Sequence, residues 1–483
     1  MSEGVNRFTP LFRPRTVAIV GASANSAAQG NRFIRMLRQA GFSGSIYPIH
    51  PSEPAIEGLQ AFPSLAQTPE PIDYAIVAVA GEKVPGLLAA AAGRVRFAQV
   101  MSSGFAESEG GRELENSLLD AARSGGMRLL GPNCMGIHST RGRLTFVAGG
   151  PDVQGSVGVM SQSGGLSIDM VLRGRVRGLR YSEVVSLGNC ADLGPDDLLE
   201  YFLADPATGV IGAYLEHIRD GRRFFDLLRG ARATKPVVIL KGGRTRQGQR
   251  AAASHTGSLA SNDQIWRALA KQTGSVLVDT LEDFLDVLVA FQAFTPREAP
   301  PTGRVLLLGN GGGASVLATD YLARRGLDVA PLDAPATEAL THLGLPAGAS
   351  IANPIDVPAN VLQRNRGAVM REILELLADN VHSDAILMHV NLAVILSYKE
   401  VDMLGNFVEA AVRAKEALRG RTHLSLALRA NGEAELEDRR RASRLQAMEA
   451  GIAVFDELSS QAMATAAVHD YERFRYLRQA AAS

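Results

Sequence analysis

The sequence predicts an α/β protein with about three domains, each built on a parallel β-sheet. Strand-sized apolar runs alternate with helical patterns along the chain, which is typical of parallel sheets covered by helices. A Gly/Ser-rich turn follows the first strand of each unit. With 483 residues, the chain is also too long for a single hydrophobic core.

The composition narrows the class of protein. Hydrophobic residues make up 46% and charged residues 21% of the chain, as in ordinary soluble domains. The 50 basic residues balance 50 acidic ones, which argues against a nucleic-acid or membrane-surface partner. The two cysteines are too few for a disulfide framework and indicate a reducing compartment. No apolar run reaches signal-peptide length at the N-terminus or the roughly 20 residues that span a bilayer. We therefore expect a cytoplasmic protein.

The first unit is expected over residues 1–148. Its strands are predicted at 16–23, 45–51, 74–80, 97–104 and 127–133, and its first helix at 31–42. The second unit is expected over 149–296, with strands starting near Gly155 and continuing at 181–189, 210–218 and 236–244. The Pro-rich segment 295–303 is the clearest linker in the chain.

The third unit is expected over 303–483. Its strands are predicted at 304–309, 385–392, 423–429 and 453–458, and a helical stretch over 459–481 follows.

Each first strand leads into a turn that could hold a phosphate, because a helix N-terminus offers free N–H groups and partial positive charge. These turns are GASANSAAQGNRF (21–33), MSQSGGL (160–166) and GNGGGAS (309–315). In the second turn, the groups that could bind an anion belong to Ser161, Ser163, Gly164 and Gly165. No turn matches the P-loop pattern GxxxxGK[ST], so a P-loop kinase or ATPase is not supported.

The first turn loosely resembles a dinucleotide fingerprint, with G-x-S where G-x-G is expected. An NAD site also needs an acid at the end of the second strand, but that strand ends in His50-Pro51, and Glu53 is poorly placed. Coenzyme A (CoA) is therefore more plausible than NAD, and an NAD-linked oxidoreductase is a weak alternative. A tight turn without a ligand stays open.

His255 stands in RAAASHTGSLA (250–260), which we expect to be a small-residue loop without the spacing of metal ligands. It is either a solvated bystander or a phosphohistidine, which needs an accessible nitrogen, a nearby anion site and a carboxylate on its other ring nitrogen. MSQSGGL could supply the anion site, and Glu216, at the end of a predicted strand, could supply the carboxylate. Glu216 could equally be a surface residue at a strand edge.

A series of motifs runs in order along nearly the whole chain. They are GAS…GNRF in the first turn, SSGFAE (102–107), LLGPNCMG (129–136), GVMSQSGGL (158–166), SLGN (186–189), YLE (214–216), KGGRT (241–245), AAASHTGSLA (251–260), GNGGGASVLATD (309–320) and NPIDV (353–357). In this order they resemble the nucleoside-diphosphate-forming acyl-CoA synthetases, the ADP-forming acetate–CoA ligase group related to succinyl-CoA synthetase.

The resemblance implies a CoA-binding Rossmann domain followed by two flavodoxin-like, succinyl-CoA ligase-type domains. It implies the reaction acyl-CoA + phosphate + ADP ⇌ carboxylic acid + CoA + ATP, through an acyl phosphate and a phosphohistidine. By motif, His255 is the phosphorylated residue, Glu216 orients it, and Ser163, Gly164 and Gly165 bind the phosphoryl group. The CoA site would be lined by Gly21, Ser23, Ala24, Ser103, Gly104 and Asn133.

The chain departs from the family pattern in several places. No ATP-grasp module is recognisable, so we expect an α-type subunit that forms a hetero-oligomer with an ATP-grasp β-type partner carrying ADP or ATP with Mg²⁺. Relatives often have a Lys two residues after His50, where Ser52 stands here, and His217 replaces a common Gly. Cys134 is expected to be a packed turn residue, and Cys190 a structural residue near the acyl site.

A catalytically silent CoA-binding protein is the remaining alternative, although retention of His255, Glu216 and SQSGG argues against it. The substrates would be a small carboxylic acid or its acyl-CoA, and phosphate. No motif marks the pocket that selects the acyl group.

Overall fold

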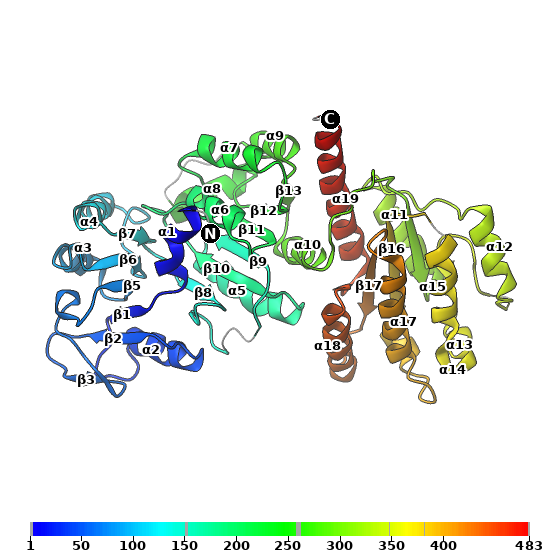
Figure 1. Ribbon diagram of the computed structural model, residues 1–483, viewed down its shortest axis with the longest axis horizontal. Helices are drawn as coiled ribbons and strands as arrows, with labels where there is room; N and C mark the ends of the chain where they lie inside the picture. The colour runs from blue at the N-terminus through cyan, green and yellow to red at the C-terminus, as the bar shows by residue number, and fades with distance from the viewer. Residues whose placement is uncertain (1–2, 150–152, 257–261, 347, 381, 482–483) are drawn as a thin grey trace. The chain divides into compact units, whose positions relative to one another are not determined.

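The computed structural model describes residues 3–149, 153–256, 262–346, 348–380 and 382–481 (Figure 1). The chain divides into two compact units. One comprises Met1–Gly174 with Arg180–Asp279, and the other comprises Arg175–Leu179 with Thr280–Ser483. The first unit contains two large sheets and the second contains one. The predicted α/β class with parallel sheets is confirmed.

The first sheet has the strand order β2-β1-β5-β6-β7, and every pairing in it is parallel. Its strands are β1 (Thr16–Val20), β2 (Ser45–Ile49), β5 (Ile72–Val77), β6 (Val95–Val100) and β7 (Arg128–Leu130). The helices of this region are α1 (Glu3–Phe12), α2 (Gln29–Gln39), α3 (Val84–Ala89) and α4 (Arg112–Ser124), with the 3₁₀ helices η1 (Leu65–Gln67) and η2 (Gly81–Lys83). A short hairpin joins β3 (Ala55–Ile56) to β4 (Leu59–Gln60).

The second sheet has the order β13-β12-β11-β9-β10-β8. Its strands are β8 (Gly136–Ser139), β9 (Val157–Ser161), β10 (Tyr181–Ser186), β11 (Val210–Leu215), β12 (Val237–Lys241) and β13 (Val276–Val278). The helices that follow these strands are α5 (Gly164–Val176), α6 (Pro195–Ala204), α7 (Gly221–Ala231), α8 (Arg246–Thr256) and α9 (Asp263–Thr273).

One edge of the second sheet differs from the expectation of parallel strands, because β8 pairs antiparallel with β10. The sequence predicts a single strand near 127–133, but the chain ends β7 at Leu130 and leaves the first sheet. Gly131 and Gly136 adopt φ values of 100° and 97° in this passage, which residues with a Cβ rarely reach. The passage delivers β8 to the second sheet.

The third sheet has the order β15-β14-β16-β17-β18 and is entirely parallel. Its strands are β14 (Val305–Gly309), β15 (Ile355–Asp356), β16 (Ala385–Asn391), β17 (His423–Arg429) and β18 (Ala453–Phe455). The helices of the second unit are α10 (Leu281–Ala293), α11 (Gly312–Ala323), α12 (Ala334–His342), α13 (Ala359–Leu362), α14 (Arg364–Gly367), α15 (Val369–Asn380), α16 (Leu392–Ile395), α17 (Met403–Leu418), α18 (Ala434–Glu449) and α19 (Leu458–Ala480).

Alternation along β14 shows why this strand is apolar throughout. Leu306 and Leu308 enter the core under α15 and α17, whereas Val305 and Leu307 enter the core under α11 and α19. Successive side chains of a strand point to opposite faces, so a strand covered on both sides needs an unbroken apolar run.

The linker at 295–303 is anchored to the third sheet. Arg297, 6% exposed at its side chain, lies 2.8 Å from both the Asp384 and the Glu472 carboxylates. Asp384 Oδ2 also accepts from the N–H groups of Thr302 and Gly303, both at 2.7 Å. Burial raises the pKa of the Asp384 carboxyl, but the neighbouring His469 and the Arg297 guanidinium outweigh it and hold this pKa well below its usual range. Breaking this buried pair would leave an uncompensated charge.

The three sheets share one plan. Counted along the chain, the parallel strands of each lie in the order 2-1-3-4-5, with β8 added at one edge of the second sheet. In this order, the crevice that binds ligands lies outside the carboxyl end of the first strand. The three small-residue turns follow β1, β9 and β14, so each lies at that crevice. None of the helices in the described part of the chain is long and apolar enough to cross a membrane.

Candidate active site

The turn between β9 and α5 presents unused amides. The Ser163 hydroxyl accepts from Leu166 N at 3.3 Å, and the Ser161 hydroxyl accepts from Ser163 N at 3.2 Å. The next amides, those of Gly164 and Gly165, have no acceptor among the described residues, as expected in the first turn of a helix. Gly165 is exposed, and a Cβ built on it would meet nothing within 4 Å. This turn, residues 161–165, is called the phosphate turn below.

Glu216 lies beside the phosphate turn because β11, which precedes it, pairs directly with β9. The hydroxyl of Tyr214, two residues earlier and within β11, donates a hydrogen bond to Glu216 Oε1 at 3.0 Å. Glu216 is only 6% exposed, so it is not the surface residue that the sequence left open. The burial and the hydroxyl together fix the carboxylate at the strand end.

Gln162 joins the two features. Its Oε1 accepts from Glu216 N at 2.5 Å and from His217 N at 3.0 Å. Its Nε2 lies 3.3 Å from both the Cys190 thiol and His217 Nδ1. One buried amide side chain therefore ties the phosphate turn to the segment that carries Glu216.

Lys241 closes the site from the next strand. It is 4% exposed, and its ammonium donates to Glu216 O at 2.9 Å and to Gly242 O. The ammonium also lies 5.6 Å from the centre of the Trp266 ring, a cation–π distance. Burial lowers the pKa of Lys241 to about 8, although the Glu216 charge opposes the shift. Burial likewise lowers the pKa of His217, with help from the Arg219 and Lys241 charges.

The segment that contains His255 differs from the expected loop. Residues 250–256 are the second half of α8, because three alanines in this stretch strongly favour a helix. The Thr245 hydroxyl accepts from Gly248 N at 3.0 Å at the start of this helix. The His255 side chain and residues 257–261 lie outside the described part of the chain.

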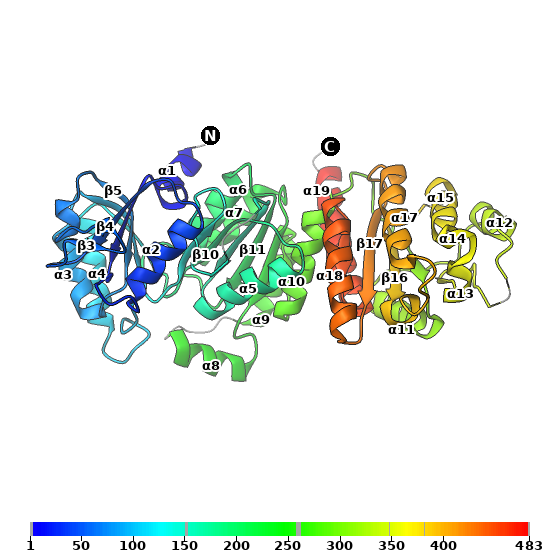
Figure 2. The ribbon, with the colours of Figure 1, turned by 90° about the horizontal axis from the view of Figure 1, so that it is seen from below.

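Strand pairing nevertheless shows where α8 starts. β12 pairs with β11 so that Lys241 lies opposite Leu215, and α8 begins five residues after β12 ends. Figure 2 shows α8 projecting below the second sheet. The helix that carries His255 is thus rooted next to the strand end that carries Glu216.

The first turn follows β1 and is shaped for a larger ligand. Gly21 adopts a φ of 98°, and a Cβ there would lie 2.2 Å from Ala78 O. Asn31 fastens the turn, because its Oδ1 accepts from Ser23 N and its Nδ2 donates to Ser23 O, both at 2.9 Å. A cavity of about 550 Å³ opens beside the turn. Its lining consists of residues Val20, Gly21, Ala22, Ser23, Ile49, His50, Pro51, Pro63, Ser64, Leu65, Ala66, Val79, Lys83, Leu87, Ala90 and Ala91.

The residues predicted to bind CoA fall into two groups. Gly21 and Ser23 line the cavity, whereas Ala24 follows them in the same turn but does not. Ser103, Gly104 and Asn133 lie instead after β6 and β7, near the second sheet.

This second group is linked to the loop after β10 through Asn189. Gly104 N donates to Glu107 Oε1 at 2.7 Å, and Asn189 Nδ2 donates to the other oxygen of Glu107 at 2.5 Å. Asn133 N donates to Ser102 O at 3.0 Å. The second group therefore lies between the first turn's sheet and the loop that leads on from β10.

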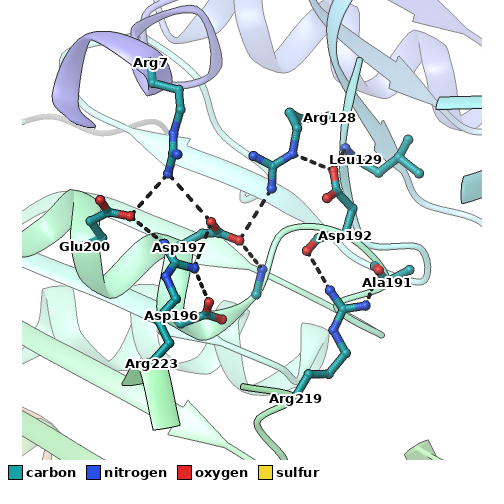
Figure 3. Close-up of polar contacts among 11 residues, drawn as sticks. Arg7, Arg128, Leu129, Ala191, Asp192, Asp196, Asp197, Glu200, Arg219 and Arg223 are labelled. Carbon is teal, nitrogen blue, oxygen red and sulfur yellow. Dashed lines mark hydrogen bonds and ion pairs between the residues drawn. The ribbon is translucent and has the colours of Figure 1, made fainter. Parts of the chain in front are cut away.

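Ion pairs join the two sheets of this unit (Figure 3). Arg128 from β7 lies 2.8 Å from Asp192, in the loop after β10, and 3.5 Å from Asp197, in α6.

Arg223 from α7 adds further ion pairs to this cluster. It pairs with Asp196, Asp197 and Glu200, the last at 2.6 Å. Arg7 from α1 reaches Glu200 at 3.4 Å, and Arg219 donates to the carbonyls of Ala191 and Asp192. The cluster holds the loop after β10, and with it Asn189 and Cys190, against the first domain.

Both cysteines are buried in this region. Burial raises the pKa of Cys134 far above its usual value and the pKa of Cys190 to about 12. A thiol with such a pKa is not a nucleophile at neutral pH. This agrees with the structural roles expected of both residues.

Sequence reasoning missed several residues of the site. Asn31, Gln162 and Lys241 stand inside the motifs GNRF, SQSGG and KGGRT, so the motifs contained a signal that was not used. Tyr214 is likewise the first residue of the motif YLE, whereas Lys83 belongs to none of the motifs and Tyr214 was not assigned a role. Both residues are found only once the strand ends are assembled.

Two known domain families match this chain. A family model described as a CoA binding domain matches residues 15–140, and a model described as a succinyl-CoA ligase like flavodoxin domain matches residues 154–291. The alpha subunit of ADP-forming acetate–CoA ligase II from Pyrococcus furiosus is 35% identical over 354 residues, which are 72% of this chain and 76% of that protein.

Two further proteins extend the comparison. ADP-forming acetate–CoA ligase I from Archaeoglobus fulgidus is 35% identical over 351 residues, which are 72% of this chain but 50% of that longer protein. The solved structure of dinucleotide forming acetyl-coenzyme A synthetase 1 from Ca. Korarchaeum cryptofilum, in complex with phosphate and ADP, superimposes with a TM-score of 0.84 at 32% identity and covers 98% of both chains.

Proposed function

Because this chain belongs to the family of ADP-forming acetate–CoA ligases, we propose that it is the α-type subunit of an ADP-forming acyl-CoA synthetase. The enzyme interconverts acyl-CoA, phosphate and ADP with a carboxylic acid, CoA and ATP. A catalytically silent CoA-binding protein is not supported, because the relatives are named as enzymes.

The observation that carries the mechanism is the position of Gln162. Its side-chain oxygen accepts from Glu216 N and His217 N, while its own backbone lies in the phosphate turn. An anion site and a buried carboxylate on neighbouring strands are thereby held in register. A phosphoryl group that must pass from bound phosphate to a histidine needs this pair of groups at a fixed separation.

In the first step, the amides of Gly164 and Gly165 hold phosphate at the start of α5. A phosphate oxygen attacks the acyl carbon of the thioester, the C–S bond breaks, and CoA leaves as a thiolate that takes up a proton. The amides and the helix N-terminus stabilise negative charge on the phosphate. The products are acyl phosphate and free CoA.

In the second step, a ring nitrogen of His255 attacks the phosphorus of the acyl phosphate. The P–O bond breaks, and the carboxylate leaves as the acid product. Glu216 accepts a hydrogen bond from the other ring nitrogen, which fixes the tautomer and stabilises the positive charge that develops on the ring. Phosphohistidine then delivers its phosphoryl group to ADP.

The nucleotide site is assigned to a partner. We propose an ATP-grasp β-type subunit that holds ADP or ATP with Mg²⁺, so that the active enzyme is a cytoplasmic hetero-oligomer. The relative from Pyrococcus is named a subunit alpha, and this chain matches only half of the longer relative from Archaeoglobus. The CoA site is proposed to run from Gly21 and Ser23 past Ser103, Gly104 and Asn133 toward the phosphate turn.

A reconstitution experiment tests the proposal. The purified chain alone should show no ATP-dependent ligation of CoA to small carboxylic acids, and addition of the β-type subunit should restore it. Ligation by the isolated chain would contradict the need for a partner. Absence of ligation from the reconstituted pair, across a panel that includes acetate, would contradict the function.

A further inference from the structure

The cavity of the first domain has an uneven charge. Most of its lining is apolar, with Ile49, Leu65, Val79 and Leu87 among the larger side chains. Its titratable lining residues are His50 and Lys83, and none of the described lining residues is Asp or Glu. A large apolar cavity with a few polar groups is typical of a site for a cofactor.

The position of the cavity identifies which part of a cofactor it faces. It lies at the carboxyl ends of β1 and β2, where a nucleotide-binding sheet of this type places a ribose. A free ribose hydroxyl is held there by an acid, whereas a ribose phosphate is held by a cation. Here the acid of the β3–β4 hairpin, Glu57, is occupied by Arg35 at 2.6 Å and Asn31 at 3.1 Å.

Two donors face the cavity. Lys83 ends η2 and is exposed, and no ion pair engages it among the described residues, although Glu82 precedes it in the chain. His50 Nδ1 accepts from Ser52 N at 3.3 Å and from Glu53 N at 3.1 Å. This hydrogen-bond network assigns the proton of the neutral ring to Nε2, which is then a donor.

We propose that this cavity binds the adenosine of CoA and that Lys83 pairs with its ribose 3′-phosphate. The apolar lining encloses the adenine, and His50 Nε2–H adds a second donor. This assignment rests on the proposed function, which supplies CoA as the cofactor, and adds the residue that reads its phosphate.

Calorimetric titration of the full chain with CoA and with dephospho-CoA, which lacks only the 3′-phosphate, tests the assignment. Lys83→Met removes the charge but keeps an apolar stem. We expect it to weaken CoA binding about tenfold, the effect of one charge-assisted contact, and dephospho-CoA binding less than about twofold. Lys83→Arg should retain most of the affinity for CoA. Arg123→Met, at the exposed end of α4, is the matched control and should change neither.

Each outcome decides the assignment. Equal losses for CoA and dephospho-CoA, or no loss for Lys83→Met, would overturn the role of Lys83 while leaving the proposed function intact. NADPH, whose ribose phosphate is at the 2′ position, is the third ligand, and competition by NADPH as strong as that by CoA would overturn the choice of CoA. Failure of the wild-type chain to bind CoA would instead reject the proposed function itself.

Discussion

The first turn and the phosphate turn follow equivalent strands of equivalent sheets, but they differ in which backbone amides are hydrogen-bonded within the protein. After β1, the helix starts only at Gln29, and Asn31 consumes the Ser23 amide. After β9, the helix starts at Gly164, and the amides of Gly164 and Gly165 stay available. The first turn therefore makes room for a large ligand beside it, and the second offers donors to a small anion.

The largest expected effect comes from filling the first turn. Gly21→Ala places a Cβ 2.2 Å from Ala78 O at a φ of 98°, so the turn must move away from β5. We expect the free energy of unfolding to fall by about 3 kcal/mol and CoA binding to weaken more than about a hundredfold. Denaturant unfolding and calorimetry measure the two effects.

Gly41→Ala is the matched control for that change. Gly41 has a φ of 75°, but a Cβ there meets nothing within 4 Å. It should cost about 1 kcal/mol and leave CoA affinity unchanged. If both variants behaved alike, close approach to Ala78 would not be the reason for Gly21.

The next effect separates the two turns by chemistry. Gln162→Leu removes the acceptor for Glu216 N and His217 N, so Glu216 loses its position relative to the phosphate turn. We expect kcat of the reconstituted enzyme to fall about a hundredfold, as for a small misplacement of reacting groups, with CoA affinity unchanged. A parallel loss of CoA affinity would show that Gln162 supports the fold of both turns instead.

A smaller effect is expected at the end of the phosphate turn. Gly165→Ala fits without a clash, so the methyl group that it adds beside the free amide is expected to crowd a bound phosphate. We predict an unchanged melting temperature and a KM for phosphate raised about tenfold. The control is Gly230→Ala in α7, where a Cβ also meets nothing within 4 Å and no phosphate effect is expected. An unchanged KM for Gly165→Ala would place the phosphate elsewhere.

The last expected effect is a pH dependence of stability set by Lys241. Burial lowers its pKa in the folded chain to about 8 from 10.5, with Glu216 opposing the shift and Arg244 adding to it. Between these two values the unfolded chain binds more protons, so the unfolding free energy contributed by Lys241 rises with pH. Below pH 8 both states are protonated, and the burial penalty is complete.

Lys241→Met should remove that rise. Denaturant unfolding at pH 8, 9 and 10 should show a wild-type gain in stability over this interval that the variant lacks. Parallel curves for the two proteins would mean that Lys241 titrates normally in the folded chain.

The sequence predicts the parallel sheets and the strand ends that carry the site, because buried strands and small-residue turns leave strong local patterns. It does not predict that Gln162 reaches Glu216, since this contact spans 54 positions and depends on β9 and β11 being neighbours. Nor does it reveal Lys83, which enters the cavity only through the pairing of β1 with β5.

At residues 250–256 and at Ser23, the local structure differs from the prediction because of neighbouring residues. Residues 250–256 are poor in bulky side chains, which indicates a loop, but three consecutive alanines favour continuation of α8. The position of Ser23 in its motif suggests a backbone amide that could donate to a ligand. In the structure this amide donates to Asn31 Oδ1, eight residues further on. In both places the neighbouring residues decided the backbone conformation, which the residue types of the motif alone do not predict.

Detection of phosphate on His255 is the most direct test of the proposed phosphoryl transfer. The chain is incubated with acetyl phosphate, or with ATP and the β-type subunit, and digested with trypsin. Cleavage after Arg250 and Arg267 yields a peptide whose sole histidine is His255. We predict acid-labile phosphate on this peptide in the wild type, none in His255→Asn, and slower labelling in Glu216→Gln. Wild-type chain that stays unlabelled under both conditions, or His255→Asn that labels like the wild type, would contradict the proposed transfer.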